Sequence, residues 1–274
     1  MPFVFNSPHS GRQYPQSLLD HSPFTPLQLR CTEDAYVDML FENVVAMGAP
    51  LLCANFPRVW LDVNRETYEL DPLLFRERLP AHANTRSPRV AAGLGIVPRL
   101  ISENRPIYTT PPTLREAADR ITRIYRPYHD MIRRLMGVTL ADFGRAVLVD
   151  CHSMPSNAPR PREAARPDIV IGDRYGTSCN AAIHRELVMA FTDLGYSVAR
   201  NAPYAGGFIT EHYGRPAKGF HAVQIEINRG LYLNERTLEP LDGFVALQQD
   251  LNQVVERLLK TDVPGLSQHP QAAQ

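Results

Sequence analysis

The run AVLVDCH at residues 146–152 decides the fold. Its apolar start is typical of a buried strand, and the run ends in Asp150 and His152. A second run, HAVQIEI at 221–227, is also mostly apolar but carries Glu226 near its end. Because alternate residues of a strand point to the same face, Asp150 and His152 share one face of theirs.

Working outward from these two runs, strand-like and helix-like segments alternate along the chain. Such alternation predicts a layered α/β fold with a mostly parallel or mixed sheet, whose ligands bind at the carboxyl ends of the strands. The further predicted strands are 3–7, 49–54, 58–63, 168–172 and 196–200, and the predicted helices are 34–48, 113–136 with a kink at Pro127, 178–194 and 240–260.

The chain's 274 residues, 44% of them hydrophobic, suffice for one large α/β domain or at most two small ones. We predict a single catalytic domain over residues 1–263, with long loops at 76–112 and 155–167. The segment 264–274 is polar, and we expect it to be a disordered tail.

Charge and cysteine content narrow the function classes. The 29 Lys and Arg balance the 29 Asp and Glu, so no net field favours nucleic acid or a membrane surface. The four cysteines form no C-x-x-C pair, which suits a reducing compartment. The amino-terminal residues lack a signal-peptide pattern, and no window is apolar enough to span a membrane. We therefore expect a cytoplasmic protein, and the sequence carries no signal of its oligomeric state.

Four positions are candidates for metal or proton chemistry. His9 lies in S-P-H-S-G, where Pro and Gly fix the backbone and permit close approach, although a surface histidine is the alternative. A carboxylate beside His152 can fix the tautomer of a metal ligand, although an ordinary Asp–His hydrogen bond is the alternative. Glu33 and Asp34 precede a predicted helix, where acidic residues more often act as caps.

Glu226 is the strongest single signal, because a carboxylate in an apolar strand costs free energy unless it is paired or has a task. The alternative is an amphipathic edge strand with a wet face. Two Asn-Arg pairs also follow predicted strands, and arginine offers a planar fork for carboxylates. These pairs and a nearby arginine favour an anionic substrate, with surface salt bridges as the alternative; the residues are Arg58, Asn64, Arg65, Asn228 and Arg229.

Two histidines and one carboxylate, with one position left for water, make a catalytic zinc set, and a separate glutamate can serve as general base. The chain has no H-E-x-x-H, P-loop, G-x-S-x-G or G-x-G-x-x-G motif, and their absence narrows the enzyme classes to be considered.

Together the motifs resemble the N-formylglutamate amidohydrolases, enzymes that release formate and glutamate. The matching stretches span most of the chain in family order: FNSPHSGRQYP (5–15), TEDAYVD (32–38), FPRVWLDVNRE (56–66), ELDP (69–72), VDCHSMP (149–155), GGFITEHYGRP (206–216) and QIEINRGLYL (224–233). The resemblance extends distantly to zinc carboxypeptidases and cell-wall amidases. It implies a three-layer α/β/α domain with a mixed, mostly parallel sheet.

The resemblance also implies a site. Its metal ligands would be His9, His152 and an acidic residue, either Asp34 or Glu33, with Asp34 favoured. They would hold one Zn2+ per chain, or another divalent metal.

The remaining roles follow from the same resemblance. Glu226 would be the general base, and His212 or an arginine would stabilise the oxyanion. Arg65 with Asn64, and Arg58 or Arg229, would hold the carboxylates of N-formyl-L-glutamate, which would place the protein in histidine breakdown.

Two rival interpretations stay open. A zinc amidase or carboxypeptidase-like enzyme could act on other N-acyl amino acids or short peptides. A non-catalytic protein of the same fold could bind a carboxylate ligand, although the presence of all four metal and base residues disfavours it.

Overall fold

A computed structural model describes residues 1–102, 104–158 and 166–260 of the protein. The chain divides into two compact units. The first comprises residues 1–7, 36–52 and the chain from 132 onward, and the second comprises 8–35 and 53–131. The prediction of one catalytic domain over 1–263 stays a prediction, and the predicted tail 264–274 lies outside the described residues.

The first unit is built on a six-stranded sheet with the order β2-β1-β5-β8-β6-β7. β1 is parallel to β5 and β5 to β8, whereas β6 runs antiparallel to β8 and parallel to β7. The predicted mixed, mostly parallel sheet is therefore confirmed. The strands are β1 (Phe3–Ser7), β2 (Leu51–Cys53), β5 (Ala146–Met154), β6 (Ile169–Gly172), β7 (Val198–Arg200) and β8 (Phe220–Asn228).

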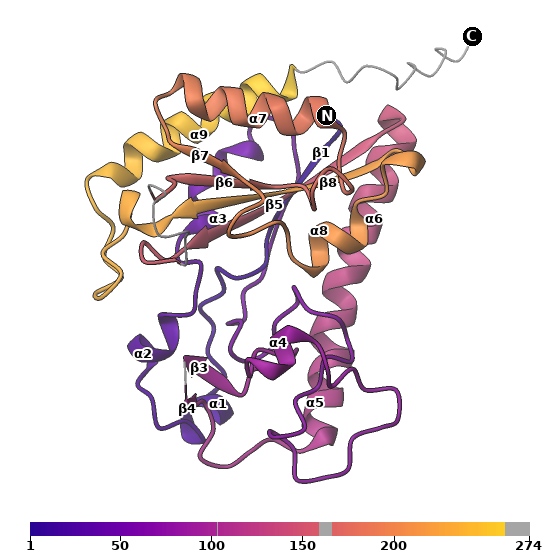
Figure 1. Ribbon diagram of the computed structural model, residues 1–274, viewed down its shortest axis with the longest axis vertical. Coiled ribbons are helices and arrows are strands. Elements are labelled where there is room, and N and C mark those ends of the chain that lie inside the picture. The colour runs from indigo at the N-terminus through magenta and orange to yellow at the C-terminus, as the bar shows by residue number, and fades with distance from the viewer. Residues whose placement is uncertain (103, 159–165, 261–274) are drawn as a thin grey trace. The chain divides into compact units, whose positions relative to one another are not determined.

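Helices cover both faces of this sheet. α7 (Ala181–Asp193) and α9 (Gly243–Leu259) lie side by side over one face, and α8 (Phe208–Tyr213) lies on the other (Figure 1). α9 buries one apolar stripe at helical spacing, formed by Leu247, Leu251, Val254, Val255 and Leu258. The unit also contains α3 (Val37–Leu40) and 3-10 turns at Glu42–Val44, Pro216–Lys218 and Arg229–Leu231. The predicted α/β/α layering is thus found in this unit.

The second unit consists mostly of turns and short elements around an apolar core. Its short helices are α1 (Gln16–Asp20), α2 (Pro26–Arg30) and α4 (Pro88–Ala91), and β3 (Leu100–Ser102) pairs with β4 (Arg105–Pro106). The predicted loop at 76–112 therefore contains α4 and this small hairpin. Residues 159–165 of the other predicted loop lie outside the described residues.

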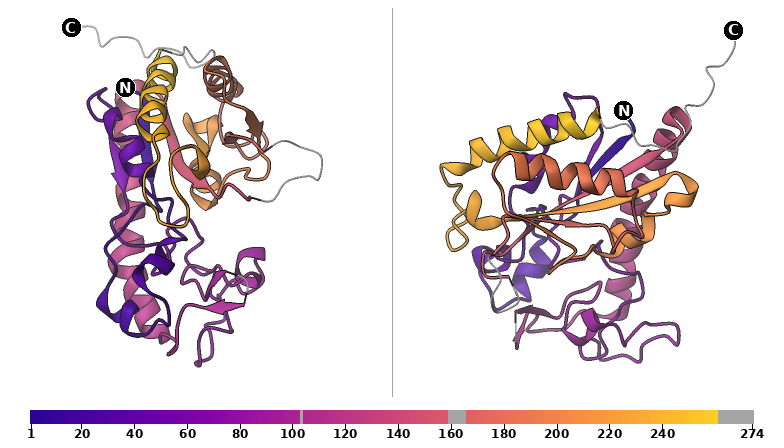
Figure 2. Two further views of the ribbon diagram at one scale, coloured as in Figure 1. Left: turned by 90° about the vertical axis from the view of Figure 1, so that its left-hand side faces the viewer. Right: turned by 45° about the horizontal axis from the view of Figure 1, so that its top comes forward.

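The long predicted helix at 113–136 continues beyond its predicted end. It comprises α5 (Leu114–Arg120), a π-helical turn (Ile121–Tyr125) and α6 (Arg126–Phe143), which follow one another without a break (Figure 2). Thr113 and Glu116 form a capping box at its start. The π turn ends two residues before Pro127, whose missing N–H removes a regular helical hydrogen bond. The kink predicted at Pro127 stays a prediction.

Two local predictions need correction, and one helix was missed. Residues 58–63 form turns rather than the predicted strand, and the helix predicted at 34–48 is reduced to α3 and a 3-10 turn. α8 was not predicted, because six residues are too few for a clear helical period. Among the described residues, no helix is both long and apolar enough to cross a membrane.

Candidate metal and catalytic site

His152 and Glu226 face each other across two neighbouring strands. In the parallel pairing of β5 with β8, His152 is the register partner of Glu226, and Asp150 is the partner of Gln224. β8 lies inside the sheet between β5 and β6, so the interpretation of Glu226 as part of an edge strand is wrong. Both side chains are buried, with exposed fractions of 3% for His152 and 8% for Glu226.

Asp150 holds His152 from the side. Its Oδ2 lies 3.0 Å from Nε2 of His152, which confirms that the two side chains share a face. The other oxygen, Oδ1, accepts a hydrogen bond from Nδ2 of Asn6 on β1 at 2.7 Å. Asp150 is fully buried. A carboxylate fixed in this way directs one imidazole nitrogen and leaves Nδ1 as the atom suited to a metal.

Glu226 is oriented by a relay of amide groups. Nε2 of Gln224 donates to Oε1 of Glu226 at 2.9 Å. The backbone N–H of Gly207, at the start of α8, donates to Oε1 of the same glutamine at 2.8 Å. The Gly-rich loop before α8 therefore fixes Gln224, and Gln224 fixes Glu226.

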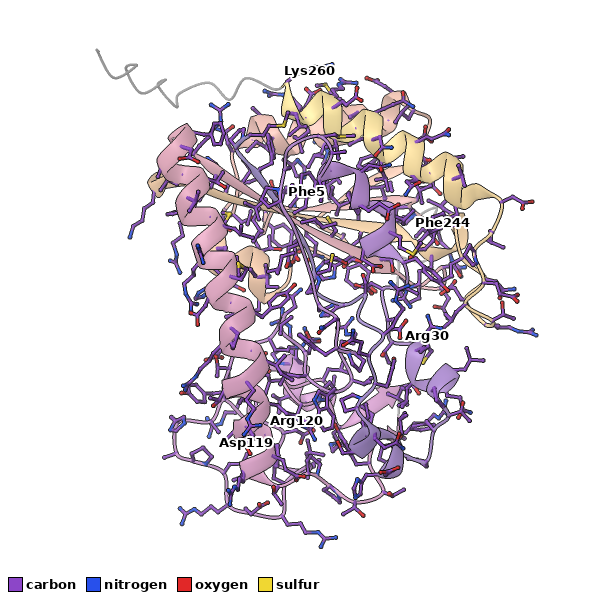
Figure 3. All side chains as sticks on the ribbon, turned by 180° about the vertical axis from the view of Figure 1, so that it is seen from behind. Phe5, Arg30, Asp119, Arg120, Phe244 and Lys260 are labelled. Carbon is purple, nitrogen blue, oxygen red and sulfur yellow. The ribbon has the colours of Figure 1, made fainter. Side chains whose placement is uncertain are left out.

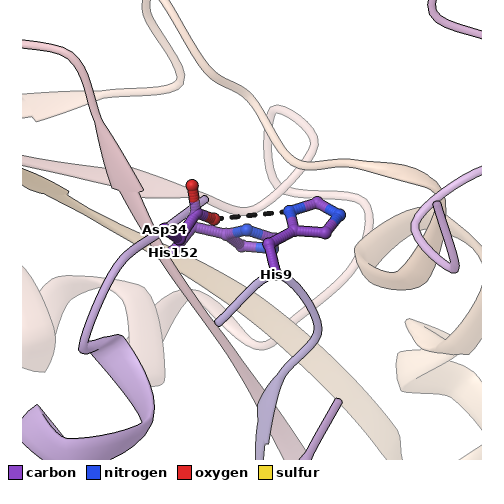
Figure 4. A group of neighbouring side chains, drawn as sticks. All are labelled: His9, Asp34 and His152. Carbon is purple, nitrogen blue, oxygen red and sulfur yellow. Dashed lines mark hydrogen bonds and ion pairs between the residues drawn. The ribbon is translucent and has the colours of Figure 1, made fainter. Parts of the chain in front are cut away.

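His9 belongs to the second unit and contacts two carboxylates. Its Nδ1 lies 3.3 Å from Oδ2 of Asp34 (Figure 4). Its Nε2 lies 2.8 Å from Oδ1 of Asp62. The backbone N–H of Asp34 also donates to the carbonyl of His9 at 3.0 Å. A Cβ atom at Gly11 would collide with the backbone of Phe56, so the close approach expected beside His9 is present.

Asp62 is a candidate site residue that the sequence analysis missed. It is 1% exposed and contacts three cationic or polarisable groups: His9, Nη2 of Arg58 at 2.9 Å and Nη2 of Arg65 at 3.3 Å. Burial alone would raise the pKa of Asp62, but Arg65, His9 and Arg58 together hold that pKa well below its usual value. The signal was a carboxylate inside the apolar run V-W-L-D-V, the argument applied to Glu226.

Glu33 and Asp34 have different surroundings in the structure. Glu33 accepts hydrogen bonds from Tyr14 Oη at 2.8 Å and from Nε of Arg30 at 3.1 Å. Burial raises the pKa of Glu33, although these two partners oppose the shift. Neither acid caps α3, whose N-cap residue is Tyr36 and has no side-chain cap. The alternative interpretation as helix caps is therefore wrong.

The residues expected to hold substrate differ in how many contacts their polar groups already make within the protein. Arg65 is buried, and its nitrogens contact the carbonyls of Leu94 and Asn64 and the carboxylate of Asp62. The backbone N–H of Asn64 donates to Asp62 at 2.9 Å. The Arg58 side chain is 24% exposed, so it is the more accessible cation of this group.

The remaining candidates lie beyond β8 and on α8. Arg229 donates to the hydroxyl and carbonyl oxygens of Ser153, and the Asn228 side chain accepts from the N–H of Gly230. His212 is exposed on α8 and stacks on Phe208, with ring centroids 5.0 Å apart. Partial desolvation by its neighbours lowers the pKa of His212, and Arg215 and Arg133 lower it further.

Among the described residues, one group of histidine and acidic side chains could hold a metal ion: His9, Asp34 and His152, each offering one ligand atom (Figure 4). Two imidazoles and one carboxylate are the ligand types of catalytic zinc sites.

Comparison with known proteins decides the family. The family model described as N-formylglutamate amidohydrolase matches residues 1–233. The protein belongs to the N-formylglutamate amidohydrolase family. A crystal structure of N-formylglutamate amidohydrolase from Ralstonia eutropha is 36% identical, with a TM-score of 0.87, and the match covers 94% of this chain and 92% of that one.

Two further relatives of this amidohydrolase family member are N-formylglutamate deformylases. The one from Pseudomonas putida is 29% identical over 95% of this chain and 91% of its own length. The one from Pseudomonas aeruginosa is 27% identical over 95% of this chain and 92% of its own length. A protein from Agrobacterium tumefaciens, 19% identical over 94% of this chain and 90% of that chain with a TM-score of 0.59, shares the fold.

Proposed function

We propose that the protein hydrolyses the amide bond of N-formyl-L-glutamate to formate and L-glutamate, with a divalent metal, zinc, held by His9, Asp34 and His152. The observation that carries this proposal is that both histidines contact a buried aspartate through Nε2. Nε2 of His9 lies 2.8 Å from Asp62, and Nε2 of His152 lies 3.0 Å from Asp150. Aspartate behind imidazole is the usual outer shell of a metal-ligating histidine.

The donor set fits zinc. Two imidazole nitrogens and one carboxylate oxygen leave a further position of a tetrahedral site for water or substrate. A bound zinc ion would supply a water that ionises near neutral pH and would polarise the formyl carbonyl. Of the two acidic candidates, Asp34 suits this role because it faces Nδ1 of His9, whereas Glu33 is bound to Arg30 and Tyr14.

Glu226 acts as the general base in this proposal. It takes a proton from the attacking water and passes it to the nitrogen of the leaving glutamate. Its burial and its hydrogen bond from Gln224 hold the carboxylate in one orientation beside His152. Arg58, as the accessible cation, and His212 are the donors we assign to the developing oxyanion.

The carboxylates of the substrate would meet the two Asn-Arg pairs. Arg65 and Arg229 are hydrogen-bonded to the chain, so their guanidinium groups are fixed in place, although Arg65 shares its charge with Asp62. Asn64 and Asn228 supply amide groups beside them. This assignment favours a small dianionic N-acyl amino acid over a neutral one.

The substrate assignment is tested by comparing kcat/KM for N-formyl-L-glutamate, N-formyl-L-aspartate and N-acetyl-L-glutamate on the same zinc-loaded protein. We expect N-formyl-L-glutamate to be preferred over the shorter aspartate by about 10–200-fold, the discrimination typical of one methylene. A large preference for either rival substrate would instead favour the broader zinc amidase.

The general-base role is tested by Glu226→Gln. The variant should bind zinc as the unaltered protein does and lose kcat/KM by about three or more orders of magnitude, because the amide cannot take the proton. Glu235→Gln is the matched control, because the Glu235 carboxylate accepts a hydrogen bond from the backbone N–H of Ser156 and has no part in the proposed chemistry. If Glu226→Gln turns over substrate at nearly the rate of the control, Glu226 is not the general base. If the unaltered protein binds N-formylglutamate but does not cleave it, the protein is better explained as a non-catalytic binding protein.

A further inference from the structure

One face of the α5–α6 helix carries three hydrogen-bond donors that meet the same short turn. Arg120 Nη1 donates to the carbonyl of Trp60 at 3.1 Å, Tyr125 Oη donates to the carbonyl of Arg65 at 2.8 Å, and His129 Nε2 donates to the carbonyl of Val63 at 2.9 Å. All three side chains are buried, with exposed fractions of 6%, 5% and 3%. Both the helix face and the turn belong to the second unit.

The π-helical turn sets the spacing of these donors. Arg120 and Tyr125 are five residues apart, and Tyr125 and His129 are four apart. In a regular α-helix, residues that are five apart point in different directions, but in a π-helix the hydrogen bond runs from residue i to i+5. Here the N–H of Arg126 donates to the carbonyl of Ile121. The extra residue therefore brings Arg120 onto the face of Tyr125 and His129.

The turn that these donors hold has few backbone partners of its own. Residues 58–65 pair with no strand in the described structure, although the N–H of Asp62 donates to the carbonyl of Ile96 at 2.8 Å. Buried carbonyls require hydrogen-bond partners, and here side chains provide them in place of a neighbouring strand. Arg120 also lies over the Trp60 ring, 3.2 Å from its centroid, near the end of α5 (Figure 3).

We propose that Tyr125 and His129 are positioning residues, which fix the turn at 60–65 and through it hold Asp62 against His9 and Asn64 and Arg65 toward the substrate. The two accepting carbonyls, of Val63 and Arg65, lie on either side of Asn64, and Val63 directly follows Asp62. Asp62 in turn contacts Nε2 of His9. The functional part of this inference rests on the proposed metal site and substrate.

The test compares Tyr125→Phe and His129→Leu with Tyr196→Phe. Tyr196 donates to Asp250 on α9 at 2.7 Å, so its variant also loses one tyrosine hydrogen bond but leaves the 60–65 turn intact. Hydrogen–deuterium exchange of peptides covering 57–67 reports on the turn without requiring metal or substrate. Zinc dissociation constants from chelator competition, together with KM and kcat, report on the site.

We expect both helix variants to stay folded, to exchange faster in 57–67, and to bind zinc about tenfold or more weakly or show a higher KM. Tyr196→Phe should match the unaltered protein in all of these measurements. Unchanged exchange in 57–67 in both helix variants would overturn the inference, as would faster exchange with unchanged zinc affinity and KM. Failure of the unaltered protein to bind zinc or cleave N-formylglutamate would remove the proposed function, while the exchange data would still decide whether the helix holds the turn.

Discussion

At the scale of single residues, the two histidines of the candidate site are supported in the same way by different neighbours. Asp62 meets His9 and is surrounded by Arg58 and Arg65, whereas Asp150 meets His152 and is held by the neutral side chain of Asn6. The first aspartate therefore also balances two cations. Its removal should disturb more than one functional group.

Replacing either aspartate by asparagine should weaken metal binding, because the imidazole loses the carboxylate that orients it. We expect the zinc dissociation constants of Asp62→Asn and Asp150→Asn to rise by about 10–100-fold in competition with a chromophoric chelator. Asp193→Asn, which breaks an exposed contact with Arg257, is the control. If Asp62→Asn binds zinc with the affinity of the control, Asp62 pairs with Arg58 and Arg65 but does not support His9 as a metal ligand.

The sequence was most informative for residues that interrupt a pattern. Glu226 in an apolar strand and His152 at a strand end could be predicted without a structure. The pairing of His9 with Asp62 could not, because the two are separated by 53 residues and no local periodicity joins them. The choice between Glu33 and Asp34 likewise depended on which one meets Arg30 and Tyr14.

At the scale of elements, the segment RVWLDV shows where pattern reasoning fails. Its apolar residues Val59, Leu61 and Val63 alternate as in a strand and are all buried. Alternation predicts burial of one face, but a strand also needs a partner for its backbone. Here side-chain donors replace the backbone of a neighbouring strand, and the segment forms turns. The donors come from Arg120, Tyr125 and His129. β5 and β8, whose backbones pair with each other, were predicted closely.

The stripe of α9 gives an element-scale prediction about stability. Leu251 is 1% exposed in the middle of that stripe, whereas Val245 on the same helix is 58% exposed. Leu251→Ala should lower the free energy of unfolding by about 2–5 kcal/mol, through lost burial and the cavity left behind. Val245→Ala should change it by about 0.5 kcal/mol or less in urea titrations. Equal losses in the two variants would mean that α9 does not pack through this stripe.

At the scale of the whole molecule, stability should depend on buried neutral histidines of the sheet-containing unit. Burial lowers the pKa of His184, an effect that Asp173 opposes and Arg200 reinforces. Burial and Arg145 lower the pKa of His221. Neither Nε2 atom has a hydrogen-bond partner among the described residues, and the carboxylate of Asp173, 3.9 Å from Nε2 of His184, only partly offsets the effect of burial there.

The sign of the pH dependence follows from these lowered pKa values. The unfolded chain takes up a proton near pH ~6.5, whereas the folded protein resists it, so the stabilising contribution is present above that pH and is lost as pH falls. The free energy of unfolding in urea should fall between about pH 7.5 and about pH 5.5, and it should fall less in His184→Gln. The exposed His21→Gln variant should keep the original slope. An identical slope in His184→Gln would contradict this account.

The order of the strands in the sheet could not be predicted from local sequence patterns either. Strand alternation predicted a mostly parallel sheet, but the order β2-β1-β5-β8-β6-β7 and the antiparallel β6 depend on contacts between distant segments. The arrangement matters because it puts β8 beside β5, with Glu226 in register with His152.

The most direct test of the proposed metal site is elemental analysis of freshly purified protein, His152→Ala and the exposed-histidine control His21→Ala. We expect about one zinc per chain in the unaltered protein and in His21→Ala, and almost none in His152→Ala, with the activity on N-formyl-L-glutamate following the metal. The absence of metal from folded, unaltered protein, with no activity restored by added zinc, cobalt or manganese, would contradict the account.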